Sequence, residues 1–341
     1  MAKSKHITIY DVAEQAEVSI QTVSRVINNR HDVSPETRQR IQTTIEELGY
    51  KPFVNARGLA AKRTYTLGLV TADFSDFWFS RVVTGAEKEA QKLGYCFMLG
   101  SSACEPEDEP KFLRLLTERH VEGVLFVRAN REDECDHLLR LKEFGVPVVT
   151  TGHHLPEIGL AMVDVDNVSG GYKATDYLIG LGHTRIAMIT GPSEWKSVSD
   201  RTEGYLQALQ NAGIPIDQEL ILTGSWLHQS GYEKTKLLLN KKNSFTAIFA
   251  HNDRIARGAI HAIYEAGLKV PEDISVIGYD DIPEAEYSDP PLTTIRQPSA
   301  EIGQAATNLL IQMVEDSTVI PKQIMFDTTL VIRSSCRANK S

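Results

Sequence analysis

The stretch IYDVAEQAEVSIQTVSRVIN, residues 9–28, decides the fold of the N-terminal part of this chain, because it predicts two short helices joined by a tight turn. The first helix has apolar residues at the i, i+3, i+4 and i+7 positions, which are Ile9, Val12, Ala13 and Ala16. Thr8 and Ser19 are suitable N-caps for the two helices, since a hydroxyl oxygen accepts a hydrogen bond from the first turn. In the second helix, Val23, Val26 and Ile27 form a face that points inward.

A third helix is predicted to begin at Ser34-Pro35-Glu36, where proline takes the first helical position. Ile41, Ile45 and Leu48 follow at helical spacing, and Gly49 ends the helix. We expect the three short helices to share one core.

The outward residues of the second helix have the chemistry of base recognition. Two helices at this spacing fit a helix-turn-helix, and the major groove is wide enough to receive the second of them. Gln21 suits a bidentate pair with adenine, Arg25 one with guanine, and Ile20 a contact with a thymine methyl. Phosphate or mixed contacts suit Thr22, Ser24 and Asn28. The pattern alone is also compatible with a helical protein-interaction module that has a polar exterior.

The charge of the chain is unevenly distributed. A formal net charge of −9 argues against a protein that coats nucleic acid with its whole surface. Residues 1–64 contain ten Lys and Arg against seven Asp and Glu, or +3, so the remaining residues contain 26 against 38, or −12. A mildly basic N-terminal part on an acidic body is expected when only that part approaches phosphate.

Length and composition indicate a globular protein with more than one domain. A chain of 341 residues suits two to three domains, and its mean hydropathy is −0.22. No apolar run approaches the roughly 20 residues of a membrane span, and no signal peptide is recognisable, so we expect a cytoplasmic protein. The four cysteines are far apart, without a CxxC pair or zinc-finger spacing, which indicates buried or incidental thiols and no metal site.

After residue 64 the pattern changes to short β-rich runs that alternate with amphipathic helices. The runs are TLGLV (66–70), YCFMLG (95–100), GVLFV (123–127), VPVVT (146–150), RIAMIT (185–190), TAIFA (246–250) and ISVIGY (274–279). Glycines end the intervening helices at Gly94, Gly145, Gly182, Gly213 and Gly267. This repeated βα order predicts parallel sheets of the α/β class.

The string IYDVAEQAEVSIQTVSRVINNRHDVSPETRQRIQTTIEELGYKP, residues 9–52, resembles the head of the lactose-repressor (LacI/GalR) family. The resemblance implies a helix-turn-helix DNA-binding head at 1–52 and a hinge helix with linker at 53–64, for which a plain interdomain linker is the alternative. Ala56 and Leu59 match hinge positions that enter the minor groove when two subunits lie side by side on DNA. The residues expected at the DNA surface are Thr8, Tyr10, Ser19, Ile20, Gln21, Thr22, Ser24, Arg25, Asn28, Asn55, Ala56 and Leu59.

The rest of the chain resembles the effector-binding core of the same family, which is related to periplasmic binding proteins. The resemblance implies two α/β lobes around a cleft, an N-terminal lobe at 65–166 plus 297–325 and a C-terminal lobe at 167–296 plus 326–341. Its markers include Leu181-Gly182-His183, Arg201-Thr202-Glu203-Gly204-Tyr205, His251-Asn252-Asp253, Gly278-Tyr279-Asp280-Asp281 and PLTTIRQ at 291–297. Several markers follow strands, which is where ligands bind in open α/β sheets.

The chemistry at the marker positions suits a small polyol, such as a galactoside or another glycoside. Arg201 offers a fork of donors, Asp280 accepts from two hydroxyls, and Asn252 does both. Trp226 matches an aromatic of the lactose-repressor branch and is suited to cover the apolar face of a pyranose; a core tryptophan is the alternative. The expected effector contacts are Asp73, Trp78, Phe79, Arg201, Trp226, Asn252, Asp280 and Gln297. An ion pair between Arg201 and Asp280 across the lobes, and simple packing of Trp78 and Phe79, are the alternatives without a ligand.

The chain departs from the lactose-repressor pattern at two points near the expected cleft. Ala72 stands where that repressor has a serine, and Gly152 replaces an expected aspartate after the fourth strand. Recognition of the far end of the effector must therefore differ, so lactose itself is not implied. His153 and His154 follow as either effector contacts or a solvated loop pair.

These expectations converge on a homodimeric repressor that binds pseudo-palindromic operator DNA under the control of a sugar-like effector, preferably an inducer. A purine-type co-repressor and a sugar-binding protein without regulatory DNA binding are the alternatives. No enzyme is expected, because GxxxxGK[ST], HExxH and GxSxG motifs are missing and the adjacent Asp280 and Asp281 are expected to diverge, unlike a glycosidase pair. No cofactor, metal or membrane partner is expected.

Overall fold

The computed structural model describes residues 7–27, 30–50, 63–71, 74–101, 109–127, 141, 145–152, 159–241 and 245–339. Several sequence predictions lie outside these residues, namely those for Asn28, Asn55, Ala56, Leu59, Ala72, Asp73, His153, His154 and most of the hinge at 53–64. The chain divides into two compact units, Met1–Tyr65 and Thr66–Ser341.

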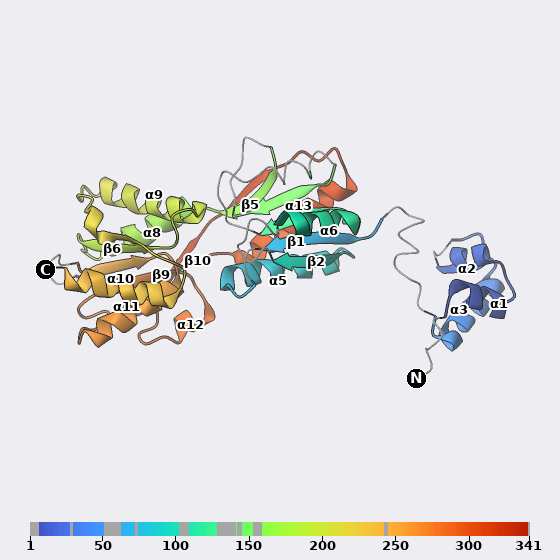
Figure 1. The fold of residues 1–341 in the computed structure, drawn as a ribbon, viewed down its shortest axis with the longest axis horizontal. Coiled ribbons are helices and arrows are strands. Elements are labelled where there is room, and N and C mark those ends of the chain that lie inside the picture. Colours follow the sequence, from blue (N-terminus) through green and yellow to red (C-terminus); the bar gives the residue numbers. More distant parts are fainter. Residues whose placement is uncertain are drawn as a thin grey trace. The chain divides into compact units, whose positions relative to one another are not determined.

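Local capping interactions fix where the helices of the first unit begin and end. These helices are α1 (Ile9–Gln15), α2 (Ile20–Ile27) and α3 (Pro35–Leu48) (Figure 1). The Oγ of Ser19 accepts a hydrogen bond from the backbone N–H of Thr22 (3.1 Å), and the Oγ of Ser34 accepts one from Thr37 (3.2 Å). Gly49 ends α3 in the left-handed conformation, with φ 62°. The predicted starts of α2 and α3 and the predicted end of α3 are confirmed.

The apolar stripes of the three helices meet in one small core. Its buried side chains are Val12, Ala13, Ala16, Val23, Val26, Ile41 and Tyr50, with Ile9, Ile27, Ile45 and Leu48 partly buried against them. All of these except Tyr50 were predicted from helical spacing. Burying each larger aliphatic side chain stabilises the unit by about 1.5–3 kcal/mol, so the periodicity of the sequence accounts for the packing of this unit.

The second unit begins with a lobe built on a parallel sheet. Within the described residues the sheet order is β11-β5-β4-β3-β1-β2, and all its pairings are parallel. The strands are β1 (Thr66–Thr71), β2 (Cys96–Ser101), β3 (Val124–Val127), β4 (Val148–Thr151), β5 (Ala161–Val165) and β11 (Gln323–Phe326). The helices of this lobe are α5 (Phe77–Lys92), α6 (Glu109–Glu118) and α13 (Ser299–Glu315).

The second lobe repeats this architecture with a sheet of order β12-β10-β9-β8-β6-β7. Its strands are β6 (Ile186–Thr190), β7 (Ile221–Thr223), β8 (Ala247–Ala250), β9 (Ser275–Asp280), β10 (Thr293–Arg296) and β12 (Thr329–Val331). Its helices are α8 (Asn167–Gly180), α9 (Lys196–Asn211), η2 (Gln218–Leu220), α10 (His228–Asn240), α11 (Asp253–Glu265) and α12 (Pro283–Glu286). The pairings are parallel except that β12 runs antiparallel to β10.

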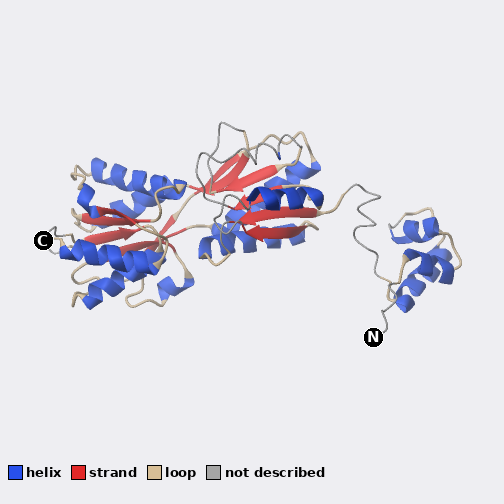
Figure 2. Cartoon of the chain, in the orientation of Figure 1, coloured by secondary structure: helices blue, strands red, loops and turns tan. Residues whose placement is uncertain are grey.

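Helices cover both faces of each sheet in the second unit (Figure 2). In β6, Ile186 and Met188 pack with α8 and α9, whereas Ala187 and Ile189 pack with α10 and α11 on the opposite face. This alternation follows from the two-residue period of a strand. The seven predicted runs all form strands, which confirms the α/β class. No helix in the described parts of the chain has the length and apolarity needed to cross a membrane.

Three segments connect the lobes within the part of the chain that the structure describes. The chain passes from β5 into α8, from β10 into α13, and from β11 into β12. The segments between these elements are only a few residues long, so residues at the strand ends of one lobe lie close to the other lobe.

Candidate effector cavity and DNA-binding surface

Helix α2 presents a polar stripe at the surface of the first unit. At about 100° per residue, four of its side chains fall within an arc of about 140° opposite the buried valines; they are Ile20, Gln21, Ser24 and Arg25. Gln21 and Arg25 are exposed, and Ile20 is 39% exposed. An Nη of Arg25 lies 3.5 Å from the carboxylate of Asp32, and both side chains are more than half exposed. Such a surface pair contributes little energy, so it does not prevent Arg25 from turning toward a base.

The other described residues of the predicted DNA surface cluster at the helix starts. Thr8 is the N-cap of α1, and both its N–H and its hydroxyl donate to the carboxylate of Asp11, over 2.7 and 2.6 Å. Tyr10 is 68% exposed. The hydroxyls of Ser19 and Thr22 lie 2.8 Å apart at the start of α2. The backbone N–H groups at a helix N-terminus point toward a bound anion, so exposed hydroxyls at the same place are well placed to contact a phosphate.

A cavity of about 60 Å³ lies between the lobes of the second unit. It brings together seven of the predicted effector contacts, Trp78, Phe79, Arg201, Trp226, Asn252, Asp280 and Gln297. The remaining lining residues are Asp76, Gly152, Asp164, Asn167, Trp195 and Ser197. Of these, Gly152 had been noted only as a missing aspartate, and the others were not predicted. Most lining residues follow the carboxyl ends of strands, which is the rule by which the sequence could have pointed to Asp164 as well.

Arg201 is a buried cation at the centre of the second-lobe wall. Its Nε donates to Oδ1 of Asn167 (2.8 Å), and an Nη donates to the backbone carbonyl of His251. The guanidinium carbon lies 3.7 Å from the ring centroid of Tyr279 and 5.8 Å from that of Trp226. A guanidinium has five N–H groups and these contacts use two, so donors remain for a ligand.

The alternative of an Arg201–Asp280 ion pair across the lobes is wrong. Both residues belong to the second lobe, on α9 and at the end of β9. Within the described residues no ion pair joins them: Asp280 instead accepts a hydrogen bond from Nε2 of Gln297 (2.6 Å).

Two carboxyls with raised pKa values line the cavity, one from each lobe. Burial raises the pKa of Asp164, at the end of β5, to about 7, despite a hydrogen bond from the N–H of Val165 (2.8 Å). Burial likewise raises the pKa of Asp280 to about 7, although Arg201 lowers it. Near neutral pH both carboxyls therefore exchange between a form that only accepts hydrogen bonds and a form that also donates.

We expect Asp164 to lower the free energy of unfolding as the pH rises from 5 to 7, whereas a buried histidine with a lowered pKa, such as His251, acts in the opposite direction. The Asp164 carboxyl titrates near 7 in the folded chain and near 4 in the unfolded chain, so its stabilising contribution is complete below about pH 4 and is lost as the pH rises through 7. One such group changes the stability by at most about 1.4 kcal/mol per pH unit. Urea unfolding across this range measures the slope. The slope of the unfolding free energy against pH should be less negative in the Asp164→Asn variant than in the wild-type chain, and an unchanged slope would show that Asp164 is not one of the titrating groups.

The aromatic residues of the cavity form a continuous series across both lobes. The rings of Trp78 and Phe79 are 5.2 Å apart, those of Phe79 and Trp195 are 6.2 Å apart, and those of Trp195 and Trp226 are 5.6 Å apart at 80°. The chain contains three tryptophans, and all of them line this cavity. The Nε1 atoms of Trp78 and Trp226 are buried and have no hydrogen-bond partner among the described residues. A buried donor without a partner is costly, so these two N–H groups favour a polar ligand.

Asn252 has a structural role in addition to its place in the cavity. Its Oδ1 caps α11 by accepting from the N–H of Ile255 (2.7 Å), and its Nδ2 donates to the carbonyl of Trp226 (3.1 Å). Asn252 therefore offers fewer hydrogen bonds to a ligand than the sequence suggested. Within the described residues no cluster of His, Cys, Asp and Glu is arranged to hold a metal ion.

Both units match known proteins. Residues 8–52 match the model of bacterial regulatory proteins of the lacI family, and residues 175–336 match the model of a periplasmic binding protein-like domain. Over 329 residues the chain is 36% identical to the HTH-type transcriptional regulator DegA of Bacillus subtilis (strain 168), an alignment that covers 96% of this chain and 97% of DegA.

Two solved structures are similar over nearly the whole chain. The structure of the lac repressor dimer bound to operator and the anti-inducer ONPF has a TM-score of 0.89 and 30% identity, and the match covers 98% of this chain and 100% of that one. A complex of the transcriptional regulator CelR with cellobiose has a TM-score of 0.74 and 35% identity, with coverage of 96% and 99%.

Proposed function

Because the chain belongs to the LacI family of bacterial transcriptional regulators, we propose that it represses transcription as a homodimer on a pseudo-palindromic operator and that a small sugar in the interlobe cavity releases it. Proteins of this family are DNA-binding regulators with an effector-binding domain and are not enzymes. Because operator DNA lies in the bacterial cytoplasm, a repressor of this kind would act there. The predicted hinge at 53–64 is the segment through which the effector domain would act on the head.

The observation that carries the sugar assignment is the composition of the cavity. Asp164 and Asp280 need hydrogen-bond donors, whereas Arg201 and the indole N–H groups of Trp78 and Trp226 need acceptors. A sugar hydroxyl is both donor and acceptor, so a ring of hydroxyls satisfies all of these groups at once. The aromatic faces suit the C–H face of a pyranose, and the similar CelR structure holds cellobiose.

A purine-type co-repressor fits this cavity less well. Two nearly parallel aromatic faces form a slot for a planar base, but the rings of Trp195 and Trp226 are inclined at 80° and those of Trp78 and Phe79 at 76°, so neither pair forms such a slot. Edge-on rings line a cavity for a three-dimensional ligand rather than a slot for a flat one.

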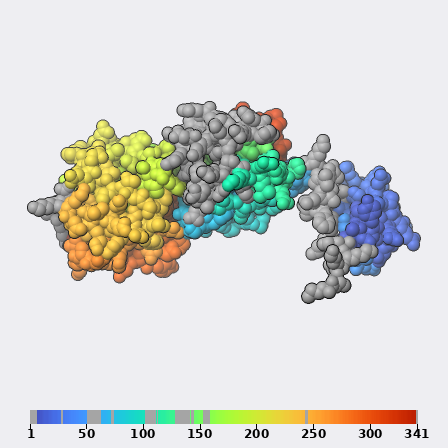
Figure 3. Space-filling view, in the orientation of Figure 1, coloured from blue at the N-terminus to red at the C-terminus, as the bar shows by residue number. Residues whose placement is uncertain are grey.

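The homodimer is supported by an exposed sheet edge on the first lobe. Among the described strands β2 lies at the edge of its sheet, and its Leu99 is 46% exposed; Leu115 of the neighbouring α6 is 40% exposed. Helix α6 lies at the surface of this lobe, in green in Figure 3. An edge strand with exposed apolar side chains favours association with a second chain. The similar lac repressor structure is a dimer on operator DNA.

An effector changes DNA affinity only through its different affinity for the two states of the regulator. The lobes touch through Phe79 and Trp195, and through Arg254, which donates to the carbonyl of Ser75 (3.0 Å). A sugar that enters between the lobes would meet these contacts, so its binding is coupled to how the lobes are arranged. An inducing sugar would bind the rearranged state more tightly than the operator-bound state.

A thermal-shift and fluorescence screen tests this function. The purified chain is mixed with monosaccharides and disaccharides, including cellobiose and ribose, and with purine bases. A sugar at about 100 times its Kd should stabilise the chain by about 2.7 kcal/mol and change the fluorescence of the three tryptophans that line the cavity. A purine that stabilises the chain while sugars do not would contradict the assignment of a sugar, and silence from all compounds would contradict the assignment of this cavity.

A further inference from the structure

The turn that ends β9 has two consecutive non-glycine residues with positive φ, Asp280 at 108° and Asp281 at 56°. Residues with a Cβ disfavour this part of conformational space, so such a turn persists only where the surrounding structure holds it. Asp280 lines the effector cavity, whereas Asp281 does not. Asp281 borders a neighbouring outer cavity of about 400 Å³, which Arg296 lines as well and which Asp280 and Gln297 share with the effector cavity.

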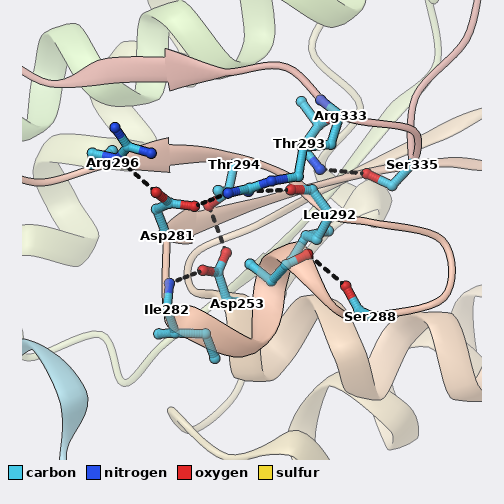
Figure 4. Close-up of polar contacts among 11 residues, drawn as sticks. Asp253, Asp281, Ile282, Ser288, Leu292, Thr293, Thr294, Arg296, Arg333 and Ser335 are labelled. Atoms are coloured by element: carbon cyan, nitrogen blue, oxygen red, sulfur yellow. Dashed lines mark hydrogen bonds and ion pairs between the residues drawn. The ribbon is translucent and has the colours of Figure 1, made fainter.

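The carboxylate of Asp281 is held by two arginines (Figure 4). One oxygen accepts from Nε of Arg296 (2.6 Å) and the other from an Nη of Arg333 (2.7 Å), and the Asp281 side chain is only 8% exposed. Arg333 is itself fixed, because its other Nη donates to the carbonyl of Leu292 (2.8 Å). Hydrogen bonds between ionised partners are the stronger ones in proteins, so this pair of contacts is an effective clasp.

A second anchor holds the residue after the turn. The N–H of Ile282 donates to one carboxylate oxygen of Asp253 (2.8 Å), and the hydroxyl of Thr294 donates to the other (2.6 Å). The side chain of Asp280 has one hydrogen bond, from Gln297, and no comparable anchor within the described residues. The direction in which Asp280 points therefore depends on the backbone of the turn together with this one hydrogen bond.

We propose that Asp281 is a positioning residue for the effector site: its carboxylate, clasped by Arg296 and Arg333, holds the turn that aims Asp280 into the cavity. This inference rests on the proposed function, because it takes Asp280 as an effector contact. Arg296 is the last residue of β10 and precedes the crossover at Gln297, so the clasp also ties the turn to a segment that joins the lobes.

A double-mutant cycle between Asp280 and Asp281 tests the proposal. The probe is cellobiose or, if another sugar gives the larger thermal shift, that sugar. Asp281→Asn keeps the shape of the side chain and tolerates a positive φ, but it removes the charge. We expect this variant to bind the probe sugar at least tenfold more weakly. Asp280→Asn should weaken it more, and the double variant should bind as Asp280→Asn does, because Asp281 acts through Asp280. Asp327→Asn is the matched control: this exposed carboxyl borders the same outer cavity and should leave the affinity unchanged.

A second readout needs no sugar. Asp280 contributes to the pH dependence of unfolding because burial raises its pKa to about 7. Asp280→Asn should make the slope of the unfolding free energy against pH less negative in the wild-type background. It should have no further effect in Asp281→Asn, in which we expect the carboxyl of Asp280 to leave its buried position.

Three results would overturn the positioning role. Asp281→Asn could bind the sugar as tightly as the wild-type chain does, or the double variant could show the product of the two single losses of affinity. The third such result is a loss of affinity in Asp327→Asn equal to that in Asp281→Asn. If the wild-type chain binds no sugar, the proposed function fails and the pH cycle alone decides the role of Asp281.

Discussion

Replacing Arg201 by alanine is expected to weaken sugar binding at least about 100-fold while leaving operator affinity within about twofold. The guanidinium is buried in the wall of the cavity, and its remaining N–H groups are the strongest donors available there. A hydrogen bond to a charged group contributes about 1.5–3 kcal/mol, so the loss of two such bonds corresponds to at least this factor. Isothermal titration with the sugar identified by thermal shift measures the loss.

The control for Arg201→Ala must separate binding from folding. The substitution also removes a partner of Asn167 and the cation over the Tyr279 ring, so the melting temperature should fall. Operator binding and dimer formation by the same preparation show that the chain is still folded. Arg201→Lys keeps the charge without the fork of donors and should recover only part of the affinity. If a folded Arg201→Ala protein bound the sugar as tightly as the wild-type chain does, the effector site would have to lie elsewhere in the protein.

Replacing Arg25 by alanine is expected to reduce operator selectivity strongly and to leave sugar affinity unchanged. A bidentate contact between arginine and guanine contributes about 1–3 kcal/mol of discrimination, and two copies act in a dimer, so selectivity should fall by roughly 30-fold or more. The fold of the head should persist, because Arg25 is exposed and its pair with Asp32 is a weak surface contact. Competition between an operator selected from random DNA and non-specific DNA measures the effect.

Arg40→Ala is the matched control for this substitution. Arg40 is an exposed arginine of the same unit, but it lies on α3 rather than on the polar stripe of α2. Arg40→Ala removes the same charge, so it should weaken the binding of operator and of non-specific DNA to the same extent. The salt dependence of binding should also become smaller. Equal loss of selectivity in Arg25→Ala and Arg40→Ala would contradict base recognition by α2.

The first unit was predicted in detail because its determinants are local. The caps at Ser19 and Ser34 and the left-handed Gly49 each act within a few residues of the chain, and helical spacing identified the residues that became its core. Seven strands of the second unit, β1–β4, β6, β8 and β9, were predicted for the same reason, because apolar runs between helices indicate them. β5 was not among the predicted runs, although its residues are fully buried, because Asp164 interrupts its apolar pattern.

The cavity was predicted only in part because it is assembled from distant segments. The pattern of the family pointed to Arg201, Asp280 and Gln297, but not to Trp195, whose ring meets Phe79 from the other lobe. Neither the capping role of Asn252 nor the conformation of the turn at Asp280 and Asp281 follows from their neighbours in the sequence. Both depend on side chains brought together by the sheets, such as Asp253 and Arg333.

The most direct test is to measure the operator affinity of the full chain with and without the stabilising sugar, by fluorescence anisotropy of labelled palindromic DNA at fixed ionic strength. Inducible repression predicts that saturating sugar raises the Kd for operator at least tenfold in the wild-type chain and has no effect in Arg201→Ala. An operator affinity that no sugar or purine changes, although a compound binds the cavity, would contradict effector control of DNA binding.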